Sequence, residues 1–353
     1  MLLFNLGKAP WRESQLIYHA LAHMGHEALV LVSPASPYVC IGYHQDVDHE
    51  VDIEYCKAND IPIFRREVGG GAVYLDGGQL FFQVIIREDN PAAPSTKHGF
   101  YRTFLQPAID VYRRIGISAV YKPINDIVVN TRKISGTGVG EIGDCIVFVG
   151  NLILDFDYQT MSRVLKVPDE KFRDKLQQTI EENLTTIRRE LGDDRAAKWD
   201  EAKLNKEMAA AFQNLLGPFS PGKIDSKLAL KVDELGRNMI NDDWLHRKRR
   251  RPHQASDLRS VQIRSGVSVI NRIHKATGGL MRADFELKEG RFLNISLSGD
   301  FFCFPADALF RLETLLSEKT ADDVKTVLEN FYEEKNLEIP GVDIDDWMQL
   351  LKI

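Results

Sequence analysis

The residues best suited to chemistry lie in a segment that joins two arginines to three successive glycines. It reads Arg-Arg-Glu-Val-Gly-Gly-Gly-Ala-Val-Tyr and supplies Arg65, Arg66, Gly69, Gly70, Gly71 and Ala72. Glycines lack Cβ atoms, so the main chain can approach a ligand and point its N–H groups at anionic oxygens, while arginine suits phosphate or carboxylate. The segment predicts an anion-binding loop, although a glycine-rich hairpin beside exposed arginines would read the same. It matches neither GxxxxGK[ST] nor GxGxxG, which argues against an ordinary P-loop or Rossmann site.

A second polar segment surrounds a predicted hairpin. A strand at residues 127–130 and a turn at 130–132 place Asn125 and Asp126 at one end of the hairpin and Lys133 near the other. Asp126 could hold Mg²⁺ through oxygen, and a partly buried Lys133 could neutralise a carboxylate or a phosphate leaving group. The alternative is a polar turn with a surface lysine.

The elements that must position these residues point to a sheet domain. Helical spacing is expected at residues 13–26 and 100–115, and strands at 28–32, 38–42, 72–75, 80–86, 127–130 and 146–154. Further helices are expected at 168–176, 184–191, 199–216 and 226–240. The fold class that follows is α/β or α+β.

The chain is long enough for two domains. At 353 residues it exceeds one ordinary core. A basic run (Arg247, Lys248, Arg249, Arg250 and Arg251) and a linker at residues 252–257 mark the predicted boundary. Strands at 261–263, 279–288 and 291–298 and helices at 306–316 and 321–334 then follow. We therefore expect one domain at residues 1–250 and a small α+β domain at 257–353.

Composition and charge limit the function classes. A net charge of −6 argues against a surface built as a whole for nucleic acid. Neither a signal peptide nor an apolar run long enough for a membrane span is found, so a cytoplasmic protein is expected. The four cysteines are widely scattered, which suggests reduced thiols rather than disulfides or a zinc site.

The two polar segments together resemble the lipoate–protein ligase family of the biotin/lipoate ligase fold. The shared pattern is Arg-Arg-x-x-Gly-Gly-Gly-Ala-Val-Tyr, then Asn-Asp about fifty residues on, then Lys-Ile-Ser-Gly. Supporting matches lie at residues 42–45, 61–64, 76–80, 163–168 (with Leu165-Lys166-Val167) and 184–191. The resemblance spans about residues 16–245, and the tail is similar to that family's accessory domain. It implies a mixed-sheet catalytic domain followed by a small α+β domain.

The resemblance also implies a reaction. Lipoate and Mg·ATP would form lipoyl-adenylate, and a lysine of a lipoyl-carrier protein, either a lipoyl domain or a glycine-cleavage H-like protein, would then attack it. Lys133 would be catalytic and Asp126 would hold the metal. The remaining ATP- and adenylate-binding residues would be Arg65, Arg66, Gly69, Gly70, Gly71, Ala72, Asn125, Ser135 and Gly136.

The chain departs from the family pattern at three places. Leu75-Asp76 stands where His-Asp is common, and Thr137-Gly138-Val139 where Ser-Ala-Gln is common. The stretch 148–152, with Asn151, replaces a usual His-Gly-Thr segment. These changes leave the expected fold intact and put the substrate and the acceptor in doubt.

Two alternatives remain. Related transferases of the same fold use a cysteine nucleophile to carry octanoyl from acyl carrier protein. In one branch this cysteine lies just before the position of Pro123, where this chain has Tyr121 and Lys122; the nearest thiol, Cys145, is interpreted as a buried packing residue. His44 and His98 are left outside the catalytic set. The basic run could bind nucleic acid, but it lacks aromatic interleaving, and a solvated linker or a docking patch for an acidic carrier is preferred.

Overall fold

The chain forms two compact units. The structure is a computed structural model that describes residues 1–94, 96–167, 169–248, 261–264 and 267–352. The first unit comprises Met1–Ile41, Glu50–Val68 and Ala72–Leu245, and the second comprises Gly42–His49, Gly69–Gly71 and His246–Ile353. The predicted linker at residues 252–257 lies outside the described residues. The glycine loop therefore belongs to the second unit, although its flanking residues belong to the first.

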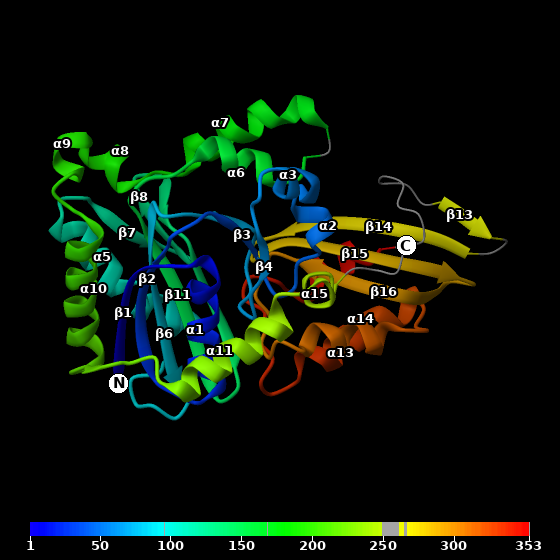
Figure 1. Cartoon of the computed structure of the whole chain (residues 1–353). Coiled ribbons are helices and arrows are strands. Elements are labelled where there is room, and N and C mark those ends of the chain that lie inside the picture. Colours follow the sequence, from blue (N-terminus) through cyan, green and yellow to red (C-terminus); the bar gives the residue numbers. More distant parts are fainter. Residues whose placement is uncertain (95, 168, 249–260, 265–266, 353) are drawn as a thin grey trace. The chain divides into compact units, whose positions relative to one another are not determined.

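A six-stranded mixed sheet is the centre of the first unit (Figure 1). Strand β1 pairs in parallel with two neighbours, whereas the remaining pairs are antiparallel. The mixed sheet predicted for the catalytic region is confirmed. In spatial order the strands are β10 (Thr137–Ile142), β11 (Cys145–Ile153), β6 (Gln79–Arg87), β2 (Ala28–Pro34), β1 (Leu2–Ala9) and β12 (Ser220–Pro221).

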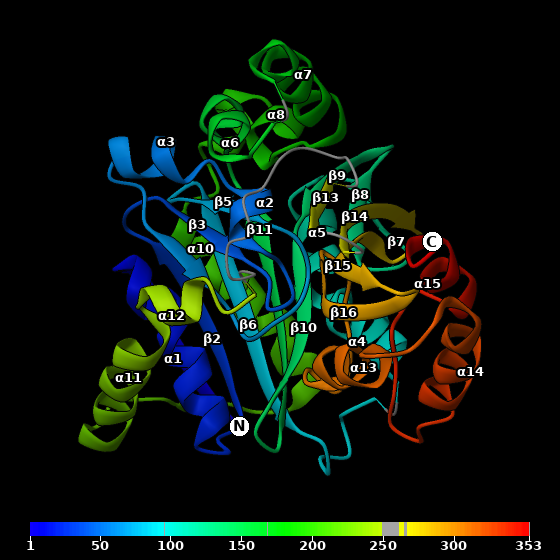
Figure 2. The same ribbon diagram turned by 90° about the vertical axis from the view of Figure 1, so that its right-hand side faces the viewer.

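Helices cover both faces of this sheet (Figure 2). On one face α1 (Trp11–His23) packs against β2, β6 and β11, and α11 (Ser226–Met239) packs on α1. On the other face α5 (Gln106–Arg114) and α10 (Glu201–Leu216) pack together, and Phe82 of β6 meets Phe148 and Phe212 there. Both faces are buried, so the central strands are apolar along most of their length.

Two three-stranded sheets carry the polar segments. One has the order β4 (Ile63–Arg65), β3 (Tyr38–Ile41), β5 (Val73–Leu75), so the residues on both sides of the glycine loop flank β3. The other has the order β7 (Ala119–Lys122), β8 (Asp126–Val129), β9 (Arg132–Ser135). The predicted hairpin is confirmed as β8–β9, and Asn130 takes φ 55° in its turn.

The helical region expected at residues 100–115 is confirmed, but it is not one continuous helix. The segment forms two helices, α4 (Lys97–Phe104) and α5, which meet at Leu105. Pro107 lies in the first turn of α5, and its missing N–H cannot continue the hydrogen bonds of α4.

The helical region predicted after residue 161 is confirmed, with shifted boundaries. The helix expected at 168–176 begins instead as η1 (Glu170–Phe172) and α7 (Arg173–Asn183), and the one expected at 184–191 begins at Ile187 because Thr186 caps its N-terminus. The other helices of the first unit are α3 (Ile53–Ala58), α6 (Tyr158–Val164), α8 (Ile187–Leu191), α9 (Asp193–Ala196) and α12 (Asp242–Leu245); α2 (Val47–Glu50) ends at the unit boundary.

The second unit has its own sheet and core. Four antiparallel strands lie in the order β13 (Val261–Arg264), β14 (Val267–Ala276), β15 (Gly279–Lys288), β16 (Arg291–Gly299). Buried and half-buried residues alternate along β15, as expected for a sheet with one covered face. Helices α13 (Ala308–Leu316), α14 (Ala321–Tyr332) and α15 (Ile344–Leu350) complete this core around Trp347.

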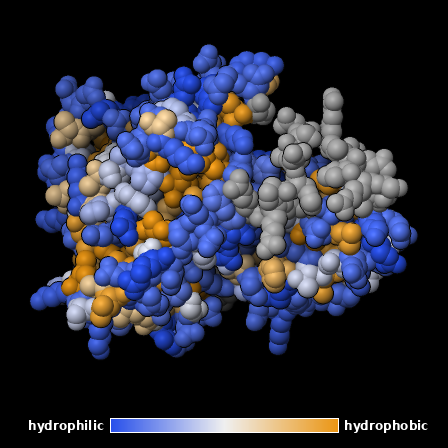
Figure 3. All heavy atoms as spheres, turned by 45° about the vertical axis from the view of Figure 1, so that its right-hand side comes forward, coloured by the Kyte–Doolittle hydropathy of each residue, from blue (hydrophilic) through white to orange (hydrophobic). Residues whose placement is uncertain are grey.

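The surface is mainly hydrophilic on the face drawn in Figure 3, where apolar residues form separate patches. Among the described residues, no helix has both the length and the apolar character needed to cross a bilayer.

Candidate functional site

The structure brings Lys133 and Asp126 into contact. Lys133 Nζ lies 2.6 Å from Asp126 Oδ1, and the two side chains are 36% and 27% exposed. The register of β8 and β9 shifts between Ile127 and Val128, so that Val128 pairs with Lys133. A partly exposed cation that is already paired with a carboxylate can also bind an incoming anion.

The main chain around Lys133 is held by two other parts of the chain. The Lys133 carbonyl accepts a hydrogen bond from the Thr185 N–H at 2.8 Å. The hydroxyl of Tyr112, a buried residue of α5, donates to the Ile134 carbonyl at 2.7 Å. Ser135 is fully buried at the end of β9. Neither Thr185 nor Tyr112 stood out in the sequence, because each acts through a hydrogen bond to main chain that is distant in sequence.

Asn125 is held through its main chain. The Thr137 hydroxyl donates a short hydrogen bond to the Asn125 carbonyl. Thr137 is the first residue of β10 and one of the departures from the family pattern. The Thr137 side chain therefore holds the main chain directly before Asp126, the first residue of β8.

Both arginines of the first segment are buried and bound to main-chain carbonyls. Arg65 is fully buried, and its Nη2 and Nε donate to the Leu245 carbonyl at 2.6 and 3.1 Å. In return Trp244 Nε1 donates to the Arg65 carbonyl at 2.9 Å. Arg66 Nη1 donates to the Cys40 carbonyl at 3.2 Å and reaches the Cys40 sulfur at 3.5 Å. These bonds fix β4 to α12 and to β3, and the predicted phosphate contact of the two arginines remains a prediction.

A buried histidine fixes the residue that follows the arginines. His19 of α1 lies with Nδ1 2.7 Å from the Gln15 carbonyl, which can only accept, so Nδ1 carries the proton. Its Nε2 therefore accepts from the Glu67 N–H at 3.1 Å. The Glu67 carboxylate lies 2.8 Å from His23 Nε2. Helix α1 thus anchors both the main chain and the side chain of Glu67, two residues before the glycine loop.

The glycine loop itself approaches main chain very closely within the second unit. A Cβ added to Gly42 would lie 1.9 Å from the Gly70 carbonyl oxygen, and Gly70 takes φ 93°. A Cβ on Gly69 would lie 2.8 Å from the ring of Phe302. Glycine is thus required at these positions by space and by backbone conformation. Ala72 directly precedes β5 and returns the chain to the first unit.

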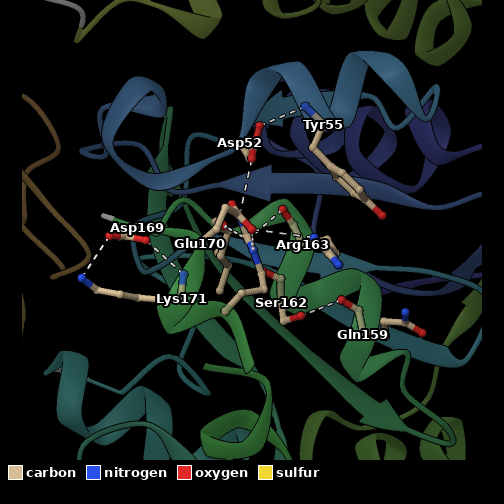
Figure 4. A network of polar contacts seen from close by, with 10 residues as sticks. Asp52, Tyr55, Gln159, Ser162, Arg163, Asp169, Glu170 and Lys171 are labelled. Atoms are coloured by element: carbon tan, nitrogen blue, oxygen red, sulfur yellow. Dashed lines mark hydrogen bonds and ion pairs between the residues drawn. The ribbon is translucent and has the colours of Figure 1, made fainter. Parts of the chain in front are cut away.

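Arg173 organises the described part of the matched segment at residues 163–168, and its partners Ser162, Glu170 and Asp52 are labelled in Figure 4. Arg173 Nη1 donates to the carbonyls of Ser162 and Leu165 at 2.5 and 2.7 Å. Its Nη2 lies 2.6 Å from Glu170 Oε1 and 3.6 Å from Asp52 Oδ2. The guanidinium group therefore caps the C-terminal end of α6 and fixes the turn into α7.

The burial of Cys145 supports its interpretation as a packing residue. It begins β11, is buried, and pairs with Arg87 of β6. Burial raises the pKa of its thiol, which disfavours the thiolate needed for nucleophilic attack. His44 stacks on Phe301 in the second unit with ring centroids 6.0 Å apart, and the side chain of His98 lies outside the described residues.

The described part of the basic run is engaged within the second unit. Lys248 Nζ lies 3.0 Å from Glu313 Oε1 and donates to the Leu297 carbonyl at 3.2 Å. Arg247 lies 4.2 Å from the ring centroid of Tyr43. Arg249, Arg250 and Arg251 lie outside the described residues.

The comparisons with known proteins identify the family. Residues 10–213 match the model of the lipoyl protein ligase A/B catalytic domain. This match covers more than half of the chain, and the protein belongs to that family of lipoate ligases and transferases.

Individual relatives include both kinds of enzyme. Lipoate-protein ligase A subunit 1 of Thermoplasma acidophilum is 35% identical over 159 residues, which cover 42% of this chain and 59% of that protein, less than two thirds of its length. Lipoate-protein ligase LplJ of Bacillus subtilis is 26% identical over 89% of this chain and 88% of its own. Octanoyltransferase LipM of Kyrpidia tusciae is 25% identical over 60% of this chain and 84% of its own.

A solved structure supports the fold. The bipartite lipoate protein ligase of Thermoplasma acidophilum, described together with its E2 lipoyl domain, superposes with a TM-score of 0.63 at 26% identity. The match covers 72% of this chain and 98% of that one. The predicted biotin/lipoate ligase-like fold is therefore confirmed.

Proposed function

We propose that this protein is an ATP-dependent lipoate–protein ligase. The observation that carries the proposal is the Lys133–Asp126 pair, a partly exposed cation and carboxylate 2.6 Å apart on a hairpin held from several sides. A free carboxylate is a poor acyl donor, so an activating enzyme must hold a carboxylate and a phosphate together. A lysine in this setting supports that task because it can neutralise both anions.

In the first step a lipoate carboxylate oxygen would attack the α-phosphorus of ATP, and the bond to the pyrophosphate leaving group would break. Lys133 would bind the acyl carbonyl and the phosphate oxygens, with Asn125 and Asp126 beside it. The glycines at 69–71 would line the acyl group and the adenylate. Arg65 and Arg66 would add positive charge near the phosphate, and Ser135 and Gly136 would continue the binding segment.

In the second step a lysine amine of the acceptor would attack the carbonyl of lipoyl-adenylate, forming an amide, releasing AMP and losing a proton. The acceptor proposed is a lipoyl domain or a glycine-cleavage H-like protein. The similarity to the bipartite ligase of Thermoplasma acidophilum, which was described together with its E2 lipoyl domain, supports this class of partner.

The residues around Lys133 are compatible with a magnesium ion that binds together with ATP. No group of three or more His, Cys, Asp or Glu side chains able to enclose a metal occurs among the residues that the structure describes. Mg²⁺ in nucleotide sites is usually held by one or two carboxylates together with the substrate's phosphates, and Asp126 offers one such carboxylate. Mg²⁺ bound there would neutralise phosphate charge.

The octanoyltransferase is a second candidate because LipM proteins are among the relatives. It would take octanoyl from acyl carrier protein without ATP and would need a thiol nucleophile. The burial of Cys145 and the raised pKa of its thiol favour the ligase.

One experiment separates the two candidates. The purified chain is incubated with a lipoyl domain and either lipoate plus Mg·ATP or octanoyl-acyl carrier protein alone. The ligase releases pyrophosphate and modifies the acceptor in the first mixture only. Modification in the second mixture only would overturn the ligase proposal in favour of the transferase.

A further inference from the structure

Two buried amide side chains connect the Lys133 segment with the strand that follows the glycine loop. Asn151 of β11 is 7% exposed and Gln79 of β6 is 1% exposed. Asn151 Nδ2 donates to Gln79 Oε1 at 2.7 Å. We call these two side chains the amide bridge.

One end of the amide bridge holds Gly136. The Gly136 N–H donates to Asn151 Oδ1 at 2.7 Å, and the Asn151 N–H donates to the Gly136 carbonyl at 3.2 Å. Both polar groups of the Gly136 main chain are thus bound by one residue. Gly136 lies three residues after Lys133, between β9 and β10.

The other end holds the strand after the glycine loop. Gln79 Nε2 donates to the Tyr74 carbonyl at 3.2 Å. Tyr74 lies in the middle of β5, two residues after Ala72. The bridge therefore joins the six-stranded sheet, which contains β6 and β11, to β5 of a separate sheet and to Gly136, the residue that follows β9.

The hydrogen-bond directions fix the orientation of both amides. The bridge begins at an N–H that can only donate and ends at a carbonyl that can only accept. Turning over either amide would set donor against donor or acceptor against acceptor at both of its ends. Because the groups are buried, each lost partner would leave a desolvated polar atom, so one arrangement is strongly preferred.

We propose that Asn151 and Gln79 are positioning residues that set where Lys133 stands relative to β5. This inference rests on the proposed function, in which Lys133 binds the reacting acyl and phosphate groups. A shift of about 1 Å in a catalytic group can cost about 100-fold in rate, so a bridge that fixes the main chain three residues away matters for the chemical step. The bridge also gives the departure at Asn151 a role.

The test compares Asn151→Leu in two backgrounds. In the otherwise wild-type protein the substitution should lower the kcat of lipoate-dependent pyrophosphate release by about 10- to 100-fold, with a smaller change in the KM for lipoate. In a Lys133→Ala background it should cost less than about twofold, because a residue that acts through Lys133 has nothing left to position. Equal losses in both backgrounds would overturn the proposal and reduce Asn151 to a structural role.

A matched control is available on the same strand. Gln83 of β6 is also buried, and its Nε2 donates to the Ser14 carbonyl at 2.8 Å. Gln83→Leu also removes a buried amide side chain. The described hydrogen bond of Gln83 goes to Ser14 in α1 and to neither polar segment. Gln83→Leu should change kcat by the same factor in the otherwise wild-type protein and in the Lys133→Ala background.

A second variant and a second measurement guard against misfolding and against failure of the proposed function. Asn151→Asp keeps the size and the acceptor for Gly136 but loses the donor to Gln79, and it should show the same dependence on Lys133. Hydrogen exchange of the peptide containing Gly136 should speed up in Asn151→Leu, which removes the acceptor for the Gly136 N–H, and not in Gln83→Leu. Unchanged exchange in Asn151→Leu overturns the bridge, whereas a wild-type protein that releases no pyrophosphate but shows the exchange pattern contradicts the proposed function alone.

Discussion

The buried histidine behind the glycine segment makes the stability of the first unit depend on pH. His19 is fully buried in α1, and burial is the main cause that lowers its pKa to about 4, against an opposing contribution from Glu67. Its ring accepts a hydrogen bond from the Glu67 N–H, which only the neutral form can do. Protonation would therefore break the hydrogen bond between His19 of α1 and Glu67, which lies just before the glycine loop.

The magnitude follows from the difference between the folded and unfolded states. His19 has an ordinary pKa of 6.5 when unfolded and about 4 when folded. Above pH 6.5 both states are neutral and this residue adds no pH dependence. As the pH is lowered from 6.5 to 4, the unfolded state takes up the proton before the folded state does. The free energy of unfolding therefore decreases over this range, by about 3 kcal/mol in total. Below pH 4 the decline from this group ends.

Equilibrium hydrogen exchange of the α1 amides measures this effect locally, without assuming that the two units unfold together. The wild type should lose about 3 kcal/mol of protection relative to His19→Gln between pH 7 and pH 4. His26→Gln, which removes an exposed histidine from the following turn, controls for composition. A wild-type advantage over His19→Gln that stays constant across this range would refute the reasoning.

Three further substitutions test the site. Lys133→Ala should reduce lipoate-dependent pyrophosphate release by about 10²–10³-fold while the circular dichroism spectrum is kept, and a folded variant with the wild-type rate would remove Lys133 from the mechanism. Cys145→Ser should retain ATP-dependent lipoylation, measured as the mass shift of the acceptor, and a dead but folded variant would favour the transferase. Gly42→Ala should impair lipoate activation, because the new Cβ would fall 1.9 Å from the Gly70 carbonyl and displace the loop; unaltered pyrophosphate release would show that the loop can move aside without loss.

Local sequence signals predicted the elements that carry the site. The hairpin that presents Lys133 followed from an apolar strand, an Asn-Thr turn and a polar strand start, and the structure confirms it with Asn130 at positive φ. The runs that became β2 and β6 were equally clear because both of their faces are buried. Strand β1 was missed, since its sequence mixes polar and apolar residues at neither helical nor strand spacing.

Contacts between residues distant in sequence could not be predicted in this way. Arg65 looked like a ligand for an anion because arginines beside glycines suit phosphate, yet its guanidinium group binds carbonyls about 180 positions further along the chain. The amide bridge joins Gln79 and Asn151 across 72 positions. Such polar partners satisfy each other only once the sheets have assembled, and no local pattern of residue types encodes them.

The most direct test of the central claim is the dependence of pyrophosphate release on lipoate. The purified 353-residue chain is given Mg·ATP with and without lipoate, and then a lipoyl domain is added. The proposed function requires pyrophosphate release only when lipoate is present, followed by one lipoyl group joined to an acceptor lysine and an equal amount of AMP. Acceptor modification without ATP, from an acyl carrier protein donor, would contradict it.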